Sequence, residues 1–227
     1  MTMKVDSDRQ TRRDASPAAK GVPQLKQERA IRTRAVILKA AAAAFAERGF
    51  PNVTIVDIAD RAGMTKGAVY FHFGSKEALA LAVAEEFYRY LTHTMRPALE
   101  KDQDPVDKVA DLLRRAAASF RDDPITQAGA RLQIERQYIG VDMPLPYVGF
   151  TDLIASLLQQ GLEQGLLPEG ATPEALARVL VSAVFGAQHI SWVLEDRSDV
   201  VERTQEVLDA VLYLPRQQRA AREPVGR

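Results

Sequence analysis

Apolar side chains recur three and four positions apart through most of the chain, the spacing that places them on one face of an α-helix. One clear stripe is formed by Ile55, Ile58, Ala59 and Ala62. The alternation of apolar and polar positions that is typical of a half-buried strand does not extend over any length. The pattern therefore predicts an all-α protein with about nine helices.

The segment around this stripe predicts two helices joined by a tight turn. Thr54 precedes the stripe and Asp57 follows three residues later, a carboxylate variant of the capping box that begins helices. Gly63 lies where the stripe ends, and glycine readily adopts the positive φ of a helix terminus. Thr65 can then cap a second helix. Two helices with a glycine-containing turn between them fit a helix-turn-helix.

The second of these helices begins with small side chains and one cation, Lys66. Lysine can donate to guanine O6 or N7, and small neighbours allow a helix end to approach base edges closely. Other donors around it can contact phosphate oxygens. The residues expected to contact DNA are Arg32, Thr54, Thr65, Lys66, Gly67, Ala68, Tyr70, His72 and Lys76. The alternative is a short surface helix in an ordinary bundle, with a solvated lysine.

The stretch from Arg34 to Leu79 resembles the DNA-binding domain of the tetracycline-repressor (TetR) family, because ILKAAAAAFAERGF, TIVDIADRAGMTKGAVYFHF and SKEAL match the family pattern in order and spacing. The resemblance implies a three-helix helix-turn-helix DNA-binding domain, followed by a helical domain for ligand binding and dimerisation.

Three shorter strings, MTKGAVYFHF, GARLQIERQ and PLPYVGF, resemble the γ-butyrolactone and furan autoregulator receptors of actinomycetes. This narrower resemblance implies a repressor that a small signalling molecule releases from DNA. Such receptors commonly carry a Trp after the PLP-containing loop, where this chain has Phe150, and its only Trp is Trp192 in another helix.

Composition shifts divide the chain into four expected parts. Residues 1–25 are polar and basic and read as a disordered tail, and residues 216–227 as a flexible tail. Residues 26–74 are expected to form the DNA-binding domain, and residues 75–215 the domain for ligand binding and dimerisation.

Prolines, glycines and caps set the expected helix boundaries. The first helix is expected from about Gln27 to Arg48, and a long helix from Ser75 to about Met95, stopped by Pro97. Five further helices are expected at about 105–121, 125–138, 150–165, 173–194 and 199–214.

The formal charge of the whole chain is zero, but its distribution is uneven. Residues 20–40 carry six cations and one acid, a net charge of +5, which leaves −5 on the remainder. A basic arm in front of an acidic body would draw DNA to one end of the molecule. The charge pattern is therefore compatible with binding double-stranded DNA.

Several function classes are disfavoured. The chain has no cysteine, and its three histidines, His72, His93 and His189, form neither a helical metal pair nor part of a nucleophile motif. We therefore expect no enzyme, metal site or cofactor. No apolar run reaches the ~18–20 residues of a membrane span, and no secretory signal is present. A cytoplasmic protein without membrane contact is expected.

Four residues of the C-terminal part are candidates for a ligand pocket: Tyr88, Gln133, Tyr147 and Phe150. Phenols and an amide in apolar surroundings suit a small molecule with hydroxyl, carbonyl or carboxylate groups, and the family resemblance supports this placement. The alternative is that they are satisfied core residues. Arg131 and Glu135, four positions apart beside Gln133, could form a simple helix pair.

The helix expected at 173–194 is apolar around much of its circumference, through Leu176, Val179, Leu180, Ala183, Val184 and Ala187. It is either a buried central helix or, as the resemblance implies, half of a homodimer interface together with the last helix, through Val200, Val207, Val211 and Leu214. A two-fold dimer would bind a palindromic operator.

The expected function is a DNA-binding repressor released by a γ-butyrolactone or furan carboxylic acid, controlling secondary metabolism such as antibiotic biosynthesis. One alternative is a repressor of the same fold that senses a drug or lipid and controls an efflux or metabolic gene. Another is an architectural DNA-binding protein with no ligand.

Overall fold

The computed structural model describes residues 21–168 and 170–213, and the structural statements below concern those residues. They form nine α-helices, one 3₁₀ helix and one π-helical turn, with no strand among them. The predicted all-α fold is confirmed. Residues 1–20 of the expected N-terminal tail, the expected C-terminal tail at 216–227 and Leu214 lie outside the described residues.

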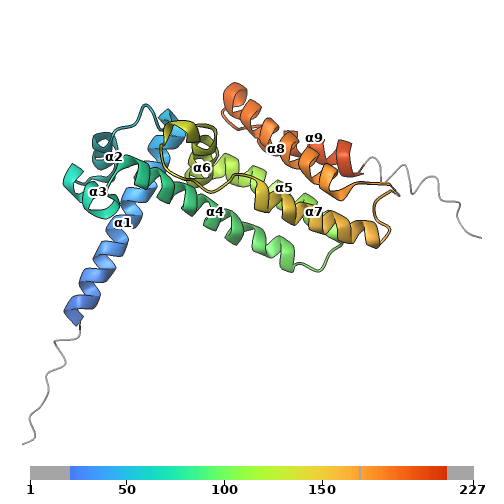
Figure 1. Ribbon diagram of the computed structural model, residues 1–227, viewed down its shortest axis with the longest axis horizontal. Helices are drawn as coiled ribbons and strands as arrows, with labels where there is room; N and C mark the ends of the chain where they lie inside the picture. The colour runs from blue at the N-terminus through green and yellow to red at the C-terminus, as the bar shows by residue number, and fades with distance from the viewer. Residues whose placement is uncertain (1–20, 169, 214–227) are drawn as a thin grey trace, which may run out of the picture. The chain divides into compact units, whose positions relative to one another are not determined.

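The helices follow one another in chain order, with the longer connections before and after α7 (Figure 1). Their bounds are α1 (Gly21–Arg48), α2 (Ile55–Ala62), α3 (Lys66–Phe73), α4 (Lys76–Glu100), α5 (Pro105–Asp122), α6 (Pro124–Ile134), α7 (Val148–Glu163), α8 (Pro173–Glu195) and α9 (Val200–Leu208). The 3₁₀ helix η2 (Arg136–Tyr138) follows α6, and the π-helical turn η3 (Asp209–Tyr213) follows α9.

The largest departures from the expected boundaries occur in α1, α4, α6 and α9. α9 was expected to reach residue 214 but ends at Leu208, where the chain passes into the π-helical turn. α1 begins at Gly21, and α6 ends at Ile134, where the chain passes into the 3₁₀ helix. α4 continues through Pro97, which was expected to stop it. Proline fixes φ near the helical value and removes one hydrogen bond. The fully buried Ala98 holds the turn beyond it in the core.

The chain divides into two compact units at the Val36–Ile37 bond. The described part of the first unit is the N-terminal half of α1, whose side chains from Leu25 to Val36 are mostly exposed. The second unit contains the remainder of α1 and all later helices. The predicted domain boundary at residues 74 and 75 stays a prediction.

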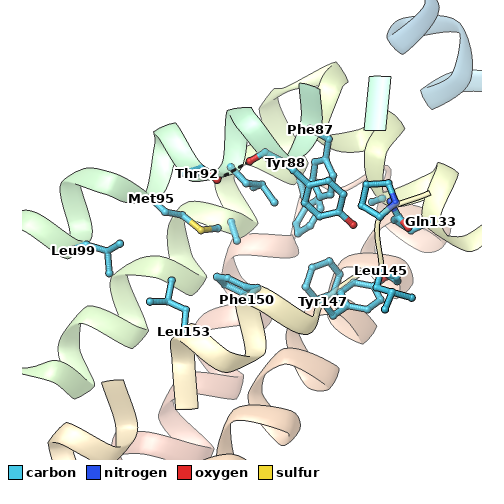
Figure 2. A pocket seen from close by; sticks show the side chains of 18 residues that line it. Phe87, Tyr88, Thr92, Met95, Leu99, Gln133, Leu145, Tyr147, Phe150 and Leu153 are labelled. Atoms are coloured by element: carbon cyan, nitrogen blue, oxygen red, sulfur yellow. Dashed lines mark hydrogen bonds between the residues drawn. The ribbon is translucent and has the colours of Figure 1, made fainter. Parts of the chain in front are cut away.

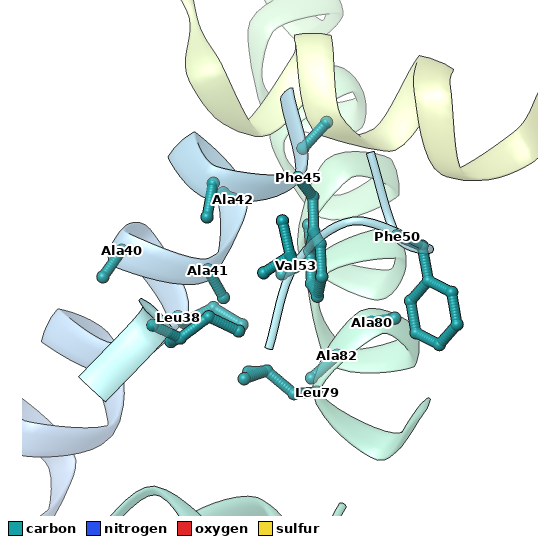
Figure 3. Packing of buried hydrophobic residues seen from close by; sticks show 14 of the residues in the cluster. Leu38, Ala40, Ala41, Ala42, Phe45, Phe50, Val53, Leu79, Ala80 and Ala82 are labelled. Atoms are coloured by element: carbon teal, nitrogen blue, oxygen red, sulfur yellow. The ribbon is translucent and has the colours of Figure 1, made fainter. Parts of the chain in front are cut away.

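In the second unit, one hydrophobic core joins the C-terminal half of α1 to α2, α3 and the first half of α4. Phe45 is fully buried at its centre, beside Val53 and near Leu79 of α4 (Figure 3). The alanines at 40–44 favour the helix, and their small side chains let neighbouring helices approach closely. This core therefore holds α2 and α3, the two helices of the helix-turn-helix, against α1 and α4.

A second core surrounds α5, which packs against α4, α6, α7, α8 and α9. α4 and α6 belong to both cores. α4 contributes Leu79 to the first and Phe87 to the second, while α6 contributes Leu132 to the first and Ala130 to the second. These two helices therefore connect the helix-turn-helix to the C-terminal bundle.

One helix among the described residues, α8, has the length and hydropathy of a membrane span. In the structure it packs against α5, α7 and α9, with Leu180 and Val184 fully buried. Only 33% of its most apolar window is buried. The hydropathy of α8 therefore comes from an exposed apolar face, which includes Val179 and Val193, as well as from the face packed in the bundle.

Candidate functional site

The capping signals predicted for α2 and α3 are present. Thr54 Oγ1 accepts from Asp57 N at 3.2 Å, and Thr54 N donates to the Asp57 carboxylate at 2.7 Å, which closes the capping box. Gly63 ends α2 with a φ of 64°. Thr65 Oγ1 caps α3 by accepting from Ala68 N at 3.1 Å. The predicted helix-turn-helix is therefore formed by two separately capped helices.

The first turn of α3 is open to solvent, because Thr65, Lys66 and Gly67 are exposed and Ala68 is half-buried. Lys66 has no acidic partner among the described residues, and its ammonium lies 5.7 Å from the centre of the Tyr70 ring. A cation flanked by small side chains at an exposed helix end has the shape and charge that reading of the major groove requires.

Two other predicted DNA contacts, Thr54 and Lys76, are engaged inside the protein. Thr54 Oγ1 donates its only hydrogen to the Asp57 carboxylate at 2.6 Å. Lys76 Nζ donates to the carbonyl oxygens of Phe50 at 2.9 Å and Val53 at 3.0 Å, and lies 4.0 Å from the centre of the Phe50 ring. Both side chains therefore hold the helix-turn-helix together.

Three more predicted contacts lie at the surface: Tyr70 is exposed and His72 half-buried on α3, while Arg32 is exposed on α1 in the first unit. Sequence reasoning missed Phe71, which is 84% exposed and meets His72 edge to face, with ring centres 5.3 Å apart. A phenyl ring in this position can contact a thymine methyl group.

A cavity of about 350 Å³ lies in the second core, lined by α4, α5, α6, α7, α8 and the loop before α7. All four predicted ligand residues line it: Tyr88, Gln133, Tyr147 and Phe150. The three polar ones gather at one end, and Leu99 and Leu153 lie at the other (Figure 2). No charged side chain lines the cavity, so it suits a molecule with one polar end and an apolar remainder.

Three polar atoms at the polar end are buried without a hydrogen-bond partner among the described residues. They are the Tyr88 hydroxyl and the amide oxygen and nitrogen of Gln133. Gln133 as a whole is only 5% exposed. A buried polar atom left unpaired costs about 1–3 kcal/mol. The Thr92 hydroxyl, in contrast, is satisfied by donating to the Tyr88 carbonyl at 2.9 Å. The unpaired atoms require both a donor and an acceptor from outside.

Tyr147 enters the cavity from the residue immediately before α7, where its φ of 67° is unusual for a residue with a side chain. Its ring packs edge to face on Phe185 of α8, with centres 4.4 Å apart. Burial raises the pKa of both the Tyr88 and the Tyr147 hydroxyl, and the proximity of Tyr147 raises that of Tyr88 further. Both phenols therefore stay protonated and can donate near neutral pH.

The cavity lies where α4 and α6 approach closely. Gly129 of α6 faces the Phe87 ring, and a Cβ atom at this position would overlap the ring. The same helix α4 begins at the helix-turn-helix, where Ser75 Oγ caps it by accepting from Ala78 N at 3.0 Å. From this cap to Tyr88 the helix rises by about 20 Å at 1.5 Å per residue. One helix thus connects the cavity to the helix-turn-helix.

Known proteins are similar to this chain in sequence and in fold. The model of bacterial regulatory proteins of the tetR family matches residues 37–83, which contain α2, α3 and the start of α4. The A-factor receptor protein of Streptomyces griseus is 33% identical over 192 residues, which cover 83% of this chain and 67% of that protein. The chain belongs to the tetR family of bacterial regulatory proteins.

Two solved structures extend the likeness of this TetR-family chain to its C-terminal bundle. One, concerned with the molecular basis for control of antibiotic production by bacterial hormones, is 49% identical with a TM-score of 0.74, over 81% of this chain and 97% of that one. The other, CprB of Streptomyces coelicolor in complex with its operator sequence, is 28% identical with a TM-score of 0.73, over 85% and 94%. The TetR fold therefore covers both the helix-turn-helix and the cavity.

Proposed function

We propose that this TetR-family chain is a transcriptional repressor that a γ-butyrolactone or a furan carboxylic acid releases from its operator. In this proposal it controls secondary metabolism such as antibiotic biosynthesis. The observation that carries the proposal is the group of unpartnered polar atoms on Tyr88 and Gln133 at one end of an apolar cavity. The A-factor receptor and the structure concerned with bacterial hormones support the choice of ligand class.

The proposed DNA-reading surface is the exposed first turn of α3. Lys66 would donate to guanine, with Thr65, Gly67 and Ala68 admitting the helix end to the groove. Tyr70, His72, Arg32 and Lys76 would contact phosphates, which position the helix without reading sequence. Thr54 acts in this proposal mainly through the capping box.

The proposed inducer has a polar head and an apolar tail. The head would accept from Tyr88, Tyr147 and the Gln133 amide group, and donate to the Gln133 carbonyl. A lactone or furan that carries carbonyl and hydroxyl groups offers both kinds of atom. Because no charged side chain lines the cavity, a carboxylate would be stabilised there by these donors alone. The tail would lie against Phe150 and continue toward Leu99.

The proposed homodimer uses the outer face of α8. Leu180 and Val184, which were candidates for the interface, are buried inside the protomer, whereas an outer set remains exposed: Val179, Ile190, Val193 and Leu194. Removing such an apolar face from water is favourable by roughly 25 cal/mol per Å² of apolar surface, and part of this gain offsets the entropy lost on association. A two-fold dimer would place two copies of α3 about 34–36 Å apart, or a multiple of that, on a palindromic operator.

Release would work through α4, which carries Tyr88 in the cavity and follows α3 directly. A ligand shifts an equilibrium only by its differential affinity for two states, and allosteric coupling typically amounts to ~1–3 kcal/mol. An inducer that favours a different tilt of α4 would change the spacing of the two α3 helices, which then no longer fit successive major grooves.

The proposal is tested by selecting bound sequences from random DNA and then adding candidate inducers to the complex. A palindromic site that γ-butyrolactones or furan carboxylic acids release at micromolar concentration is the expected result. A protein that protects no palindrome at moderate salt would refute the repressor. Release by apolar drugs or fatty acids alone would favour the alternative sensor of a drug or lipid, for which the apolar end near Leu99 and Leu153 provides room.

A further inference from the structure

Two charged side chains of α6 reach the end of α1. Arg131 Nη1 donates to the carbonyl oxygens of Ala46 at 3.1 Å and Glu47 at 3.0 Å. Glu135 accepts from Phe50 N at 2.6 Å, and the two side chains bond to each other, Nε to Oε1, at 2.9 Å. Arg131 and Glu135 are called the α6 clamp below.

The clamp satisfies backbone groups that α1 leaves unpaired. The last four carbonyl groups of a helix have no partner within it. Phe45 O accepts from Gly49 N at 2.9 Å, and Arg48 O accepts from the Asn52 side chain at 3.0 Å. Arg131 binds the two carbonyls between them. The corner after α1 is therefore completed by a side chain of α6, more than 80 residues farther along the chain.

Gly49 is required at this corner for two reasons. Its φ of 78° lies in the left-handed region that disfavours other residues. In addition, a Cβ atom there would overlap Glu135 Oε1 and lie 2.7 Å from Arg131 Nη2. The backbone just after α1 and the ends of the clamp side chains are thus in direct contact, and a side chain at position 49 would displace the clamp.

Stabilisation of α6 itself does not explain the clamp. An acidic residue four positions before a basic one supports a helix better than the reverse order, and this pair has the reverse order. Glu135 also follows directly on the last residue of α6, where the helix dipole disfavours a negative charge. Arg131 lies in the last turn of α6, where a positive charge is favoured, but Glu135 does not stabilise α6. Both side chains instead bind backbone groups at the end of α1.

Gln133 lies between the two clamp residues and faces the cavity. At 100° per residue, positions two apart point to nearly opposite sides of a helix, so the clamp and Gln133 occupy opposite faces of the same turn. That turn is the end of α6, since the helix stops at Ile134. A ligand that binds Gln133 therefore contacts the same turn of α6 that carries Arg131 and Glu135.

We infer that the α6 clamp is a pair of positioning residues that carries the state of the cavity to the helix-turn-helix. The inference rests on the proposed function, and it adds a second route beside α4. The corner at Phe50 is held from α6 by Glu135 and from α4 by Lys76. A ligand that moves α6 relative to α4 therefore changes the position of the backbone at Phe50, between α1 and α2.

The clamp also has a contact with α8. The Arg131 guanidinium lies 5.1 Å from the centre of the Trp192 ring, and that of Arg197 lies 5.0 Å from it. Arginine over an aromatic face is attracted by the ring quadrupole. The helix proposed to form the dimer interface is thereby connected to the same corner.

The test uses a permanent occupant of the cavity in place of an inducer. Ala116 of α5 lines the cavity, and Ala116→Phe would place a ring inside it. Operator affinity is measured by fluorescence anisotropy for the wild type, for Ala116→Phe, for a clamp variant that combines Arg131→Met and Glu135→Leu, and for all three changes together. With the clamp intact, Ala116→Phe should weaken operator binding about 10-fold. In the clamp variant, the same Ala116→Phe change should weaken operator binding by less than about 2-fold.

The inference would be overturned if Ala116→Phe weakened operator binding equally with and without the clamp. A clamp that is merely structural lowers operator affinity by itself but does not change the effect of filling the cavity. An Ala116→Phe protein that binds operator like the wild type would overturn it too. If the clamp variant unfolds, Glu135→Gln, which keeps size and one acceptor, replaces it. Asp122→Asn is the matched control, since it removes a carboxylate from the exposed 2.8 Å pair with Arg121, and the 10-fold loss should persist there.

The same proteins separate this inference from the proposed function. A wild type that neither γ-butyrolactones nor furan carboxylic acids release refutes the proposed inducer, whereas the comparison of the four proteins needs no inducer. If those compounds do release the wild type, they should bind the clamp variant as tightly but release it at least about 5-fold less effectively.

Discussion

Lys76 Nζ lies 2.9 Å from the carbonyl oxygen of Phe50 and 4.0 Å from the centre of the same residue's ring. The lysine that follows the cap of α4 therefore binds the corner between α1 and α2 by both a hydrogen bond and a cation–π contact. From the sequence, Lys76 was expected to contact phosphate. Its position shows that it first serves to hold α4 against the helix-turn-helix.

Lys76→Met should lower the free energy of unfolding by about 1–3 kcal/mol, because two carbonyl groups lose a charged donor. Denaturant unfolding followed by circular dichroism measures the change. Lys66→Met is the matched control, since the exposed Lys66 has no hydrogen bond to any residue that the structure describes. Equal stability of the Lys76 variant and the wild type would contradict the bracing role.

Lys66→Ala should abolish specific operator binding and leave the fold intact. Each good contact to a base edge contributes about 1–3 kcal/mol of discrimination, and a dimer loses two of them. A gel-shift titration on operator and on scrambled DNA should show that the difference between the two affinities disappears. Unchanged operator affinity would refute the role assigned to Lys66.

Tyr147→Phe should leave operator binding unchanged and raise the inducer concentration needed for release by about 3–10-fold, the effect of one lost hydrogen bond. The phenyl ring can keep the packing on Phe185. Inducer titration of a preformed operator complex measures the shift. Tyr138→Phe, at an exposed tyrosine outside the cavity, should behave like the wild type, and if Tyr147→Phe does so as well, the pocket assignment is wrong.

Asp57→Asn should destabilise the helix-turn-helix at neutral pH, with a loss that disappears in acid. The hydrogen bonds from the Thr54 side chain and backbone, and then Arg48, lower the pKa of Asp57 to about 2 from its ordinary value of 3.8. A depressed pKa stabilises the folded state above the ordinary value and loses that effect as the pH falls through about 4 to about 2. Thermal melts of both proteins from pH 7 to pH 2 should therefore converge, and a constant difference would contradict the assignment.

The helix-turn-helix was predictable because its signals are local. Thr54, Gly63 and Thr65 act on backbone groups within a few residues, so the sequence alone places both caps. Pro97 misled the prediction, since the stop signal of a proline is weaker than the burial of Ala98 in a distant core. Tertiary packing decides such cases, and one sequence does not display it.

The cavity was predictable only in part. Tyr88, Gln133 and Tyr147 were identified from residue type and family resemblance, and the structure brings all three to one end of the cavity. Arg131 and Glu135 could be recognised only as neighbours on a helix, because their partners at Ala46, Glu47 and Phe50 lie about 85 positions earlier. Exposure of Phe71 follows from its position opposite the buried side of α3, and that signal was available in the sequence.

Trp192 is the single tryptophan of the chain, and its ring lies about 5 Å from two guanidinium groups carried by different segments. Indole emission responds to nearby charge. Any rearrangement of Arg131 would therefore alter the intrinsic fluorescence of the unlabelled protein. The molecule contains its own optical reporter, located where α8, α6 and the end of α1 are connected.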